Sequence, residues 1–285
     1  MWVWKKHIAA EHEEEWQERL AEFPWAVISA LPHAKRLLVE VYDEAPGKLL
    51  ALYSCYGGDC SPVEEKDWVA ATAPENTPPL IIRDRLVISA DASEAKINEL
   101  QARYPGRIVL SFPAERAFGT GNHATTSTCL RMLCDEARKL APGQWRLIDA
   151  GCGTGVLGLA GMRLGAQSGI CYDFDPIAVE VAERNLQRNG GAENLRLFQA
   201  DVFEWSPKPE EKAHILLANL FSTVLQRAFP RLKACLAEPE SVLIVSGILR
   251  EQAEETLAAA NRHGFELLRR VTAGKWVTMK LRQRS

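Results

Sequence analysis

The sequence lacks the features that would point to a metal, a membrane or a nucleic acid. Its seven cysteines form no C-x-x-C pair and no histidine stands at zinc-finger spacing, so no metal site is expected. No apolar run approaches the roughly 18 residues of a membrane-spanning helix, and the chain begins without the apolar core of a signal peptide. A net charge of −3 does not suit a strongly cationic nucleic-acid binder. Because an odd number of cysteines without an export signal indicates free thiols, we expect a cytoplasmic protein.

What is present is ordinary globular material, 47% hydrophobic and 25% charged over 285 residues, enough for one large or two modest domains. Residues 1–58 have the pattern of a small α+β domain. Within it the runs "RLLVEVYD" and "KLLALYSCY", joined by "EAPG", predict a β-hairpin. The three prolines of "TAPENTPP" predict a boundary, so residues 59–80 are expected to be a linker and residues 81–285 a second domain.

From Thr125 onward, short apolar strands alternate with amphipathic helices. The strand-like runs are "RLIDA", "GICYD", "LRLFQ", "HILLAN" and "SVLIVSG". This alternation predicts a parallel sheet covered by helices on both faces. The last two runs, "FELLRRV" and "KWVTMKLR", are separated by a turn at Ala273 and Gly274 and must be antiparallel neighbours. We therefore predict an α/β fold with a seven-stranded, doubly wound, Rossmann-like sheet, a C-terminal antiparallel hairpin and a small N-terminal α+β domain.

A glycine-rich loop, "DAGCGTG", follows the first strand of this sheet, with Asp149 at the strand end. Glycines allow a tight turn and let a ligand approach the backbone closely. The string also contains G-x-G-x-x-G from Gly153 onward, so a nicotinamide oxidoreductase is an alternative. Asp149 argues against that alternative, because a carboxylate about 4 Å from a pyrophosphate costs roughly 4 kcal/mol. The same carboxylate would attract an ammonium group.

S-adenosylmethionine carries an amine and an adenosine but no phosphate. Two more acidic residues follow the next strands, where they can bind its ribose and its adenine. Asp173 ends the second strand, where it can accept hydrogen bonds from the ribose hydroxyls. Asp201 follows the third strand, where it can hold the adenine amino group. Asp175 is predicted to cap the next helix, with Pro176 at its first position. The residues expected to bind S-adenosylmethionine in a methyltransferase are therefore Asp149, Gly151, Gly153, Gly155, Asp173 and Asp201.

Upstream of the loop lies "AFGTGNHATT", residues 117–126, and downstream lie "DFDP" and "ANLF". In these motifs and their order the sequence resembles the PrmA family, the methyltransferases of ribosomal protein eleven of the large subunit. The resemblance covers about Leu80 to the C-terminus. It implies that residues 117–126 fold over the cofactor and that a ribosomal protein is methylated on lysine side chains or its N-terminal α-amine. The cofactor contacts that it implies are Thr126, Gly151, Asp173 and Asn219.

The segment after the fourth strand supplies candidates for the amine site. The side-chain carbonyl of Asn219 can accept from the attacking amine, so Asn219 is predicted to be catalytic; contact with the methionine part of the cofactor alone is the alternative. Phe118, expected beside the cofactor, and Phe221 can each wall the amine channel or pack in the core. Phe221 replaces the leucine usual in the family, and "PAER" replaces the usual D-P-G before residue 117. His123, without a second metal ligand, is expected to be a structural loop residue.

The partner is expected to be a basic protein, without direct nucleic-acid or membrane binding. Residues 1–59 carry ten acidic and six basic side chains, a net charge of −4, which suits a recognition domain for a basic ribosomal protein. Acids near a helix start also follow from the helix dipole. Alternatives are a class I methyltransferase acting on another protein lysine or a small molecule, and a binding protein that kept the fold without the activity. A nucleic-acid amine methyltransferase would usually show N-P-P-Y or D-P-P-Y where "ANLF" stands.

Overall fold

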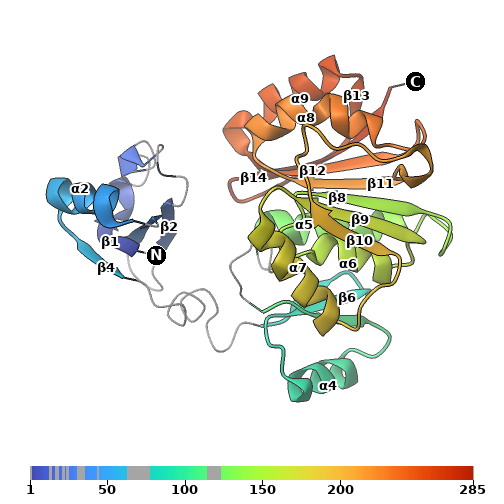
Figure 1. The fold of residues 1–285 in the computed structure, drawn as a ribbon, viewed down its shortest axis with the longest axis horizontal. Helices are drawn as coiled ribbons and strands as arrows, with labels where there is room; N and C mark the ends of the chain where they lie inside the picture. Colours follow the sequence, from blue (N-terminus) through green and yellow to red (C-terminus); the bar gives the residue numbers. More distant parts are fainter. Residues whose placement is uncertain are drawn as a thin grey trace. The chain divides into compact units, whose positions relative to one another are not determined.

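The computed structural model describes residues 2–12, 15–16, 19–20, 23, 26–30, 36–43, 45–62, 78–113 and 123–284. The chain divides into two compact units, Met1–Pro74 and Glu75–Ser285 (Figure 1). The small sheet of the first unit includes a strand at Asp59–Pro62, beyond the expected limit at residue 58. The division into recognition domain, linker and methyltransferase domain stays a prediction.

The first unit is a four-stranded antiparallel sheet that carries a helix. The strands run in the order β2-β3-β1-β4, formed by Ala26–Ala30, Arg36–Asp43, Trp2–Ala9 and Asp59–Pro62, and a 3₁₀ turn, η1 (Ala10–His12), follows β1. Its core contains Trp4, Trp16 and Val39, with the two indole rings 5.8 Å apart. The Trp4 indole N–H donates to the carbonyl of Gly57 at 2.8 Å, which ties the sheet to the end of the helix. This unit therefore has a hydrophobic core of its own.

The hairpin predicted in this unit is wrong in its second half. Residues Pro46–Tyr56 form helix α2, with proline in the first turn and Gly57 after its last residue at a φ of +67°. Leu49 and Leu52 are buried, whereas Leu50 and Tyr53 are about half exposed. The run "KLLALYSCY" is apolar on both faces, so its helical periodicity is hidden in the sequence. Proline at the start and glycine at the end are the helix signals that decide the matter.

The second unit is built on a seven-stranded sheet in the order β10-β9-β8-β11-β12-β14-β13. The strands are β8 (Arg146–Ala150), β9 (Ser168–Asp173), β10 (Leu195–Gln199), β11 (Ile215–Asn219), β12 (Val242–Leu249), β13 (Phe265–Ala273) and β14 (Trp276–Gln283). Strands β8 to β12 pair in parallel, and β14 pairs antiparallel with both β12 and β13. The predicted α/β fold with its C-terminal hairpin is confirmed.

Helices cover both faces of this sheet (Figure 1). On one face lie α5 (Ala124–Ala137), α6 (Val156–Arg163) and α7 (Pro176–Arg188), and on the other α8 (Ser222–Ala234) and α9 (Ala253–Arg262). Short 3₁₀ turns, η2 (Pro209–Glu211) and η3 (Arg250–Gln252), precede β11 and α9. Because both faces are covered, the central strand β11 is apolar and buried throughout Ile215–Ala218. Among the described helices, none has the length and apolar character needed to cross a membrane.

A smaller three-stranded sheet packs beneath helix α5. It consists of β5 (Leu80–Ile82), β6 (Leu86–Ser89) and β7 (Ile108–Ser111), with α4 (Glu94–Arg103) connecting the parallel pair β6 and β7. Ser93 caps α4 by accepting from the backbone N–H of Lys96. Ile82, Leu110 and Phe112 share one buried cluster with α5. Strand β7 belongs to this sheet and precedes the motif "AFGTG" in the sequence.

The order of strands places a crevice at one edge of the main sheet. From β8 the chain proceeds outward through β9 and β10, then returns to the other side of β8 at β11. Helices on opposite faces therefore diverge at the carboxyl ends of β8 and β11. Ligands of open α/β sheets bind at such a switch point.

Candidate active site

A cavity of about 270 Å³ lies at the carboxyl ends of the central strands. Its volume is close to the lower end of the range for small-molecule sites, about 300–1,000 Å³. The loop after β8, the ends of β9 and β11, strand β12 and the start of α5 all contribute to its lining. Five residues predicted from the sequence line it: Thr126, Gly151, Gly153, Asp173 and Asn219.

The first turn of the loop after β8 has a backbone conformation that favours glycine. Gly151 has a φ of +71°, and its N–H donates to the carbonyl of Tyr172 at 2.9 Å. A Cβ at this position would collide with the side chain of Leu220. The glycines therefore bring bare backbone to the floor of the cavity, which a ligand can approach without meeting a side chain.

Asp173 connects the end of β9 to this loop. One carboxylate oxygen accepts from the N–H of Gly153 at 2.8 Å, and the other accepts from the N–H of Asp175 at 3.0 Å. Burial raises the pKa of Asp173, and the two backbone hydrogen bonds oppose that rise. Each oxygen keeps an accepting lone pair, so the carboxylate can also receive ribose hydroxyls. The cap predicted at Asp175 is confirmed, because its side chain accepts from Ile177 N–H at 2.9 Å with Pro176 first in α7.

Asp149 lies deeper than the sequence suggested. We expected it at the mouth of the loop, but its side chain is fully buried and lies outside the cavity lining. One oxygen accepts from the N–H of Gly158 in α6 at 3.0 Å, and the other has no hydrogen-bond partner in the described part of the chain. Burial raises the pKa of this carboxyl to about 7. The role of Asp149 in cofactor binding stays a prediction.

Two other predicted residues, Gly155 and Asp201, do not line the cavity. Gly155 caps α6 and faces Ala182 on the far side of the loop. Asp201 accepts from the N–H of Phe203 at 2.8 Å and is not part of the lining. Phe118 lies outside the described residues, as does most of the segment 117–126 that the resemblance places over the cofactor.

Asn219 presents an unpartnered oxygen at the end of β11. Its side-chain nitrogen lies 3.2 Å from the hydroxyl oxygen of Thr125 and 3.5 Å from that of Thr126. Its Oδ1 is buried without a hydrogen-bond partner among the residues that the structure describes. A buried amide oxygen without a partner in a cavity can accept a hydrogen bond from a ligand.

Phe221, two residues further on, also lines the cavity. Its side chain is 72% exposed, so it does not pack in the core. The core-packing interpretation of Phe221 is therefore wrong, and its role as a wall of the amine channel stays a prediction. An exposed aromatic ring at the edge of an apolar cavity suits contact with the aliphatic part of a substrate side chain.

The lining residues that were not assigned to the site from the sequence include His123, Gly247 and Trp276. His123 caps helix α5, and its ring stands 5.1 Å from that of Trp276 in an edge-to-face arrangement. Trp276 begins β14 and reaches the site only because this strand inserts beside β12. An isolated glycine within a strand pattern, as at Gly247, is a known sign of a bulge or close backbone approach.

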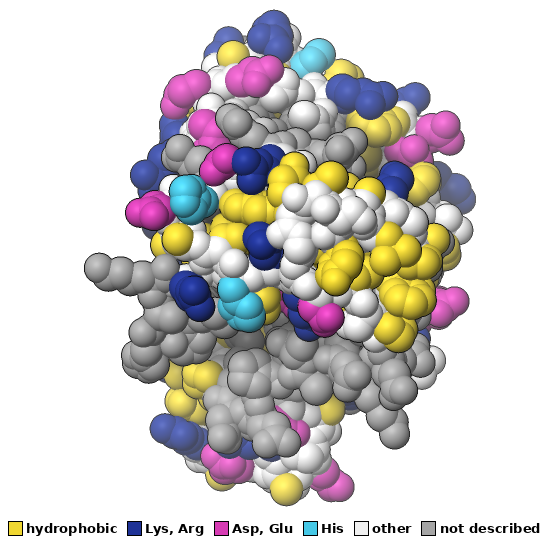
Figure 2. All heavy atoms as spheres, turned by 90° about the vertical axis from the view of Figure 1, so that its left-hand side faces the viewer, with side chains coloured by type: hydrophobic (Ala, Val, Ile, Leu, Met, Phe, Trp, Pro, Cys, Tyr) yellow, Lys and Arg dark blue, Asp and Glu magenta, His cyan; other side chains and the backbone are white. Residues whose placement is uncertain are grey.

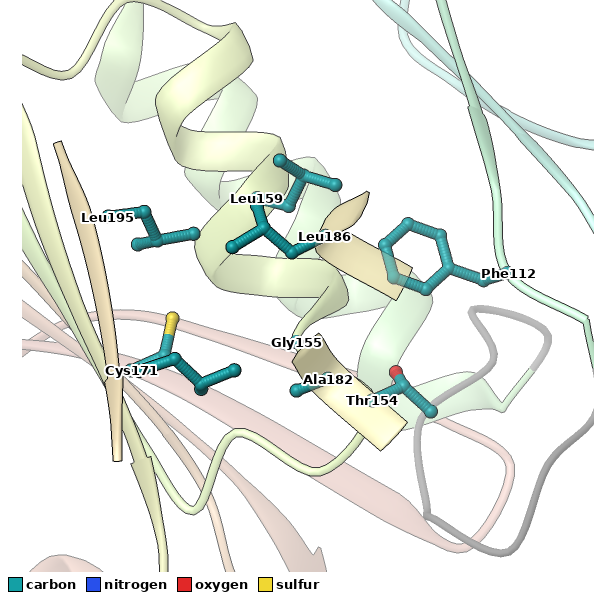
Figure 3. Close-up of a pocket in the computed structure, with 9 residues that line it drawn as sticks. Phe112, Thr154, Gly155, Leu159, Cys171, Ala182, Leu186 and Leu195 are labelled. Carbon is teal, nitrogen blue, oxygen red and sulfur yellow. The ribbon is translucent and has the colours of Figure 1, made fainter. Parts of the chain in front are cut away.

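A second cavity, on the far side of the glycine loop, holds no site. It measures about 10 Å³ and lies between α6, α7 and the sheet, with Phe112, Leu159, Leu186 and Leu195 around it (Figure 3). That volume is about the size of one water probe, and the lining is almost entirely apolar. The described residues also contain no group of three or more His, Cys, Asp or Glu side chains placed to hold a metal ion.

Comparison with known proteins identifies the family. A family model described as "Ribosomal protein L11 methyltransferase (PrmA)" matches residues 5–284. The chain belongs to this family. A PrmA relative from Pelotomaculum thermopropionicum is 34% identical over 220 residues, 77% of this chain and 67% of the relative. Another, from Sinorhizobium fredii, is 29% identical over 282 residues, 99% of this chain and 84% of the relative.

The fold of this PrmA chain also matches a solved structure. The ribosomal protein L11 methylase from Lactobacillus delbrueckii subsp. bulgaricus has a TM-score of 0.61 and 23% identity, covering 73% of this chain and all of that one. The PrmA resemblance and the expectation of an S-adenosylmethionine-dependent methyltransferase are confirmed. The nicotinamide interpretation of the glycine loop is therefore wrong. The glycine loop and Asp173 line one cavity and fit S-adenosylmethionine, and the unpartnered oxygen of Asn219 in the same cavity fits an amine donor.

Proposed function

We propose that this protein transfers methyl groups from S-adenosylmethionine to amines of ribosomal protein L11, on lysine side chains, the N-terminal α-amine or both. The family model spans almost the whole chain, and both relatives above are named ribosomal protein L11 methyltransferases. The observation that carries the proposal is the unpartnered Oδ1 of Asn219 in the same cavity as the glycine loop. That cavity offers a cofactor cradle and an amine acceptor side by side.

The cofactor would be held by the loop after β8 and by the ends of its neighbours. When bound, S-adenosylmethionine supplies a methyl group on a sulfonium centre. Asp173 would accept from the ribose hydroxyls, and backbone at Gly151 and Gly153 would form the floor beneath. Thr126, which is buried at the start of α5, would contact the same ligand. Asp149, Gly155, Asp201 and Phe118 complete the predicted cofactor set.

The substrate amine must reach the cavity as a neutral nucleophile. A lysine side chain has an ordinary pKa of about 10.4 and an α-amine about 7.7–8.0, so each must release a proton before it attacks. Transfer from water into an apolar cavity favours the uncharged form. Asn219 Oδ1 would then accept one N–H of the amine and so direct its lone pair along the line of attack. Phe221 would line the path of the side chain.

The choice of partner rests on charge and on the first unit. An acidic N-terminal segment suits a basic protein, and we infer that this unit recognises L11. On the face shown in Figure 2, lysine and arginine side chains are interspersed with acidic and hydrophobic ones rather than gathered in one basic stripe. All seven cysteines are free thiols, which supports a cytosolic location.

The direct test uses purified protein, L11 and S-adenosylmethionine with an isotopically labelled methyl group. We expect mass spectrometry to find labelled methyl groups on amines of L11. Asp173→Ala is the control, because it removes the ribose acceptor and should abolish labelling while the protein stays folded. Absence of label from L11, with labelling of another protein or a small molecule, would assign this enzyme to the alternative substrate class.

A further inference from the structure

Three side chains at the start of α5 and the end of β11 form a hydrogen-bonded chain. The ring nitrogen Nδ1 of His123 lies 2.7 Å from the hydroxyl oxygen of Thr125 and also accepts from the Thr125 backbone N–H at 3.4 Å. That hydroxyl oxygen lies in turn 3.2 Å from Nδ2 of Asn219. This hydrogen-bonded chain ends at the cavity. There the oxygen of the Asn219 amide, Oδ1, has no hydrogen-bond partner in the described part of the protein.

The hydrogen bonds of this chain have only one consistent direction. Since Nδ1 of His123 accepts from a backbone N–H, it carries no proton, and the Thr125 hydroxyl must donate to it. That hydroxyl has a single hydrogen, so its oxygen can only accept from the next group. A nitrogen of Asn219 must therefore face it, and the oxygen of the amide is left for the cavity.

Burial helps to keep the histidine in the required form. Burial of the ring lowers the pKa of His123, and the positive charge of Lys275 lowers it further. The neutral ring is thereby favoured at physiological pH, and the hydrogen bond from the Thr125 N–H selects the tautomer with an unprotonated Nδ1. The second hydrogen of the Asn219 amide points to Thr126, whose hydroxyl oxygen is 3.5 Å away. Two N–H groups thus meet two hydroxyl oxygens, and a flipped amide would lose the match to Thr125, whose only hydroxyl hydrogen is directed to His123.

We propose that His123 is a positioning residue, which acts through Thr125 to hold the Asn219 amide with its oxygen presented to the substrate amine. This inference rests on the proposed function, since it requires that Asn219 Oδ1 receives the amine. His123 and Thr125 touch no reacting atom in this arrangement. They determine which end of the amide the amine meets.

The test compares variants that remove a hydrogen bond of this chain of three side chains with variants that keep it. Thr125→Val removes the hydroxyl at nearly constant shape, and Thr125→Ser keeps it. His123→Ala removes both the acceptor and the helix cap, and His123→Asn restores an oxygen acceptor at the same cap position. We expect kcat for L11 methylation to fall roughly 10- to 100-fold in Thr125→Val and His123→Ala, as for a misplaced reactive group. Thr125→Ser and His123→Asn should recover most of that loss.

Two further measurements separate this role from a structural one. The Kd for adenosylhomocysteine should change by less than about threefold in each variant, since a positioning residue affects kcat rather than cofactor binding. In a double-mutant cycle, Thr125→Val should have no added effect once Asn219→Ala is present, because the two act as one unit. Additive effects, or a normal kcat in Thr125→Val, would overturn the inference while leaving the proposed function standing. A normal kcat in Asn219→Ala would instead remove Asn219 from the proposed function itself.

Discussion

At the scale of single residues, depth of burial determines how the acids of the site behave. Asp149 and Asp173 end neighbouring strands, yet only Asp173 lines the cavity. Asp149 lies beneath α6 with a single hydrogen bond to Gly158. A carboxylate that is removed from water with so few donors is costly to ionise, which is why burial dominates its pKa.

This burial has a measurable effect on stability. The pKa of Asp149 rises from an ordinary 3.8 to about 7 in the folded protein. Between about pH 4 and pH 7 the folded state therefore keeps a proton that the unfolded chain has lost, so this residue's contribution to stability falls as the pH rises. Above about pH 7 the carboxyl is ionised in both states, and the folded state bears the full cost of the buried charge. Each unit by which folding raises the pKa corresponds to about 1.4 kcal/mol of lost stability.

Asp149→Asn should remove that dependence, because asparagine is neutral and can still accept from Gly158. In urea unfolding without cofactor, we expect the variant to gain a few kcal/mol over the parent between about pH 4 and pH 8. At about pH 4 the two proteins should be nearly equal. A difference that does not change with pH would show that Asp149 is not a buried carboxyl of raised pKa.

The sequence contained enough information to place five lining residues, because each follows a strand or opens a helix in a recognisable motif. It could not show that Asp149 is buried, because that depth depends on how closely α6 packs over the end of β8. It also could not connect His123 to Asn219. These two residues are 96 positions apart in the sequence and meet only when α5 packs beside β11.

At the scale of elements, a bulge in β12 sets the path of the segment after β11. The register of β12 against β14 shifts between Val245 and Ile248. Gly247, within this bulge, has a φ of +83°, and an added Cβ would lie 2.8 Å from the backbone carbon of Leu220. Leu220 also covers Gly151 and directly follows Asn219. The bulge therefore fixes where the amine acceptor leaves its strand.

Gly247→Ala should slow methylation, because its methyl group must push the Leu220 backbone away. The matched control is Gly274→Ala in the β13–β14 turn, where φ is +61° and no atom lies within 4 Å of the added Cβ. Both variants bear left-handed strain of about 1–2 kcal/mol and should lose thermal stability. Only Gly247→Ala should also lower kcat, by roughly 10- to 100-fold. Equal kcat values in the two variants would show that strain alone explains the effect.

Element boundaries show what local patterns can and cannot predict. The sequence predicts the strands of the main sheet because each short apolar run is bounded by turn residues and lies between amphipathic helices. The second half of "RLLVEVYD…KLLALYSCY" was misassigned, because a run that is apolar on both faces has the same appearance in a helix and in a strand. In α2, Leu49 and Leu52 are buried and Leu50 is exposed. This difference arises from packing against the sheet, which the local sequence does not show.

At the scale of the whole molecule, the two units keep separate hydrophobic cores. The buried cluster around Trp4 and Val39 belongs to the first unit, and the two large clusters of the second unit flank its main sheet. A boundary at residue 58 would remove β1 but leave β4, whose backbone pairs with Trp2–Lys5. An unpaired strand of this kind invites aggregation, so a cut after residue 74 follows the structure better.

Removal of residues 1–74 should separate cofactor binding from substrate recognition. We expect the remaining chain, residues 75–285, to bind adenosylhomocysteine with a Kd within about threefold of the full protein, because the lining residues that the structure describes all lie in the second unit. Methylation of L11 should fall at least 100-fold, since the docking energy of a recognition unit is lost. Calorimetry measures the first quantity and labelled methyl transfer the second, with thermal unfolding as the check on folding. Methylation of L11 at the full rate by residues 75–285 would mean that recognition resides around the cavity mouth, where Phe221 is the exposed ring nearest to Asn219 in sequence.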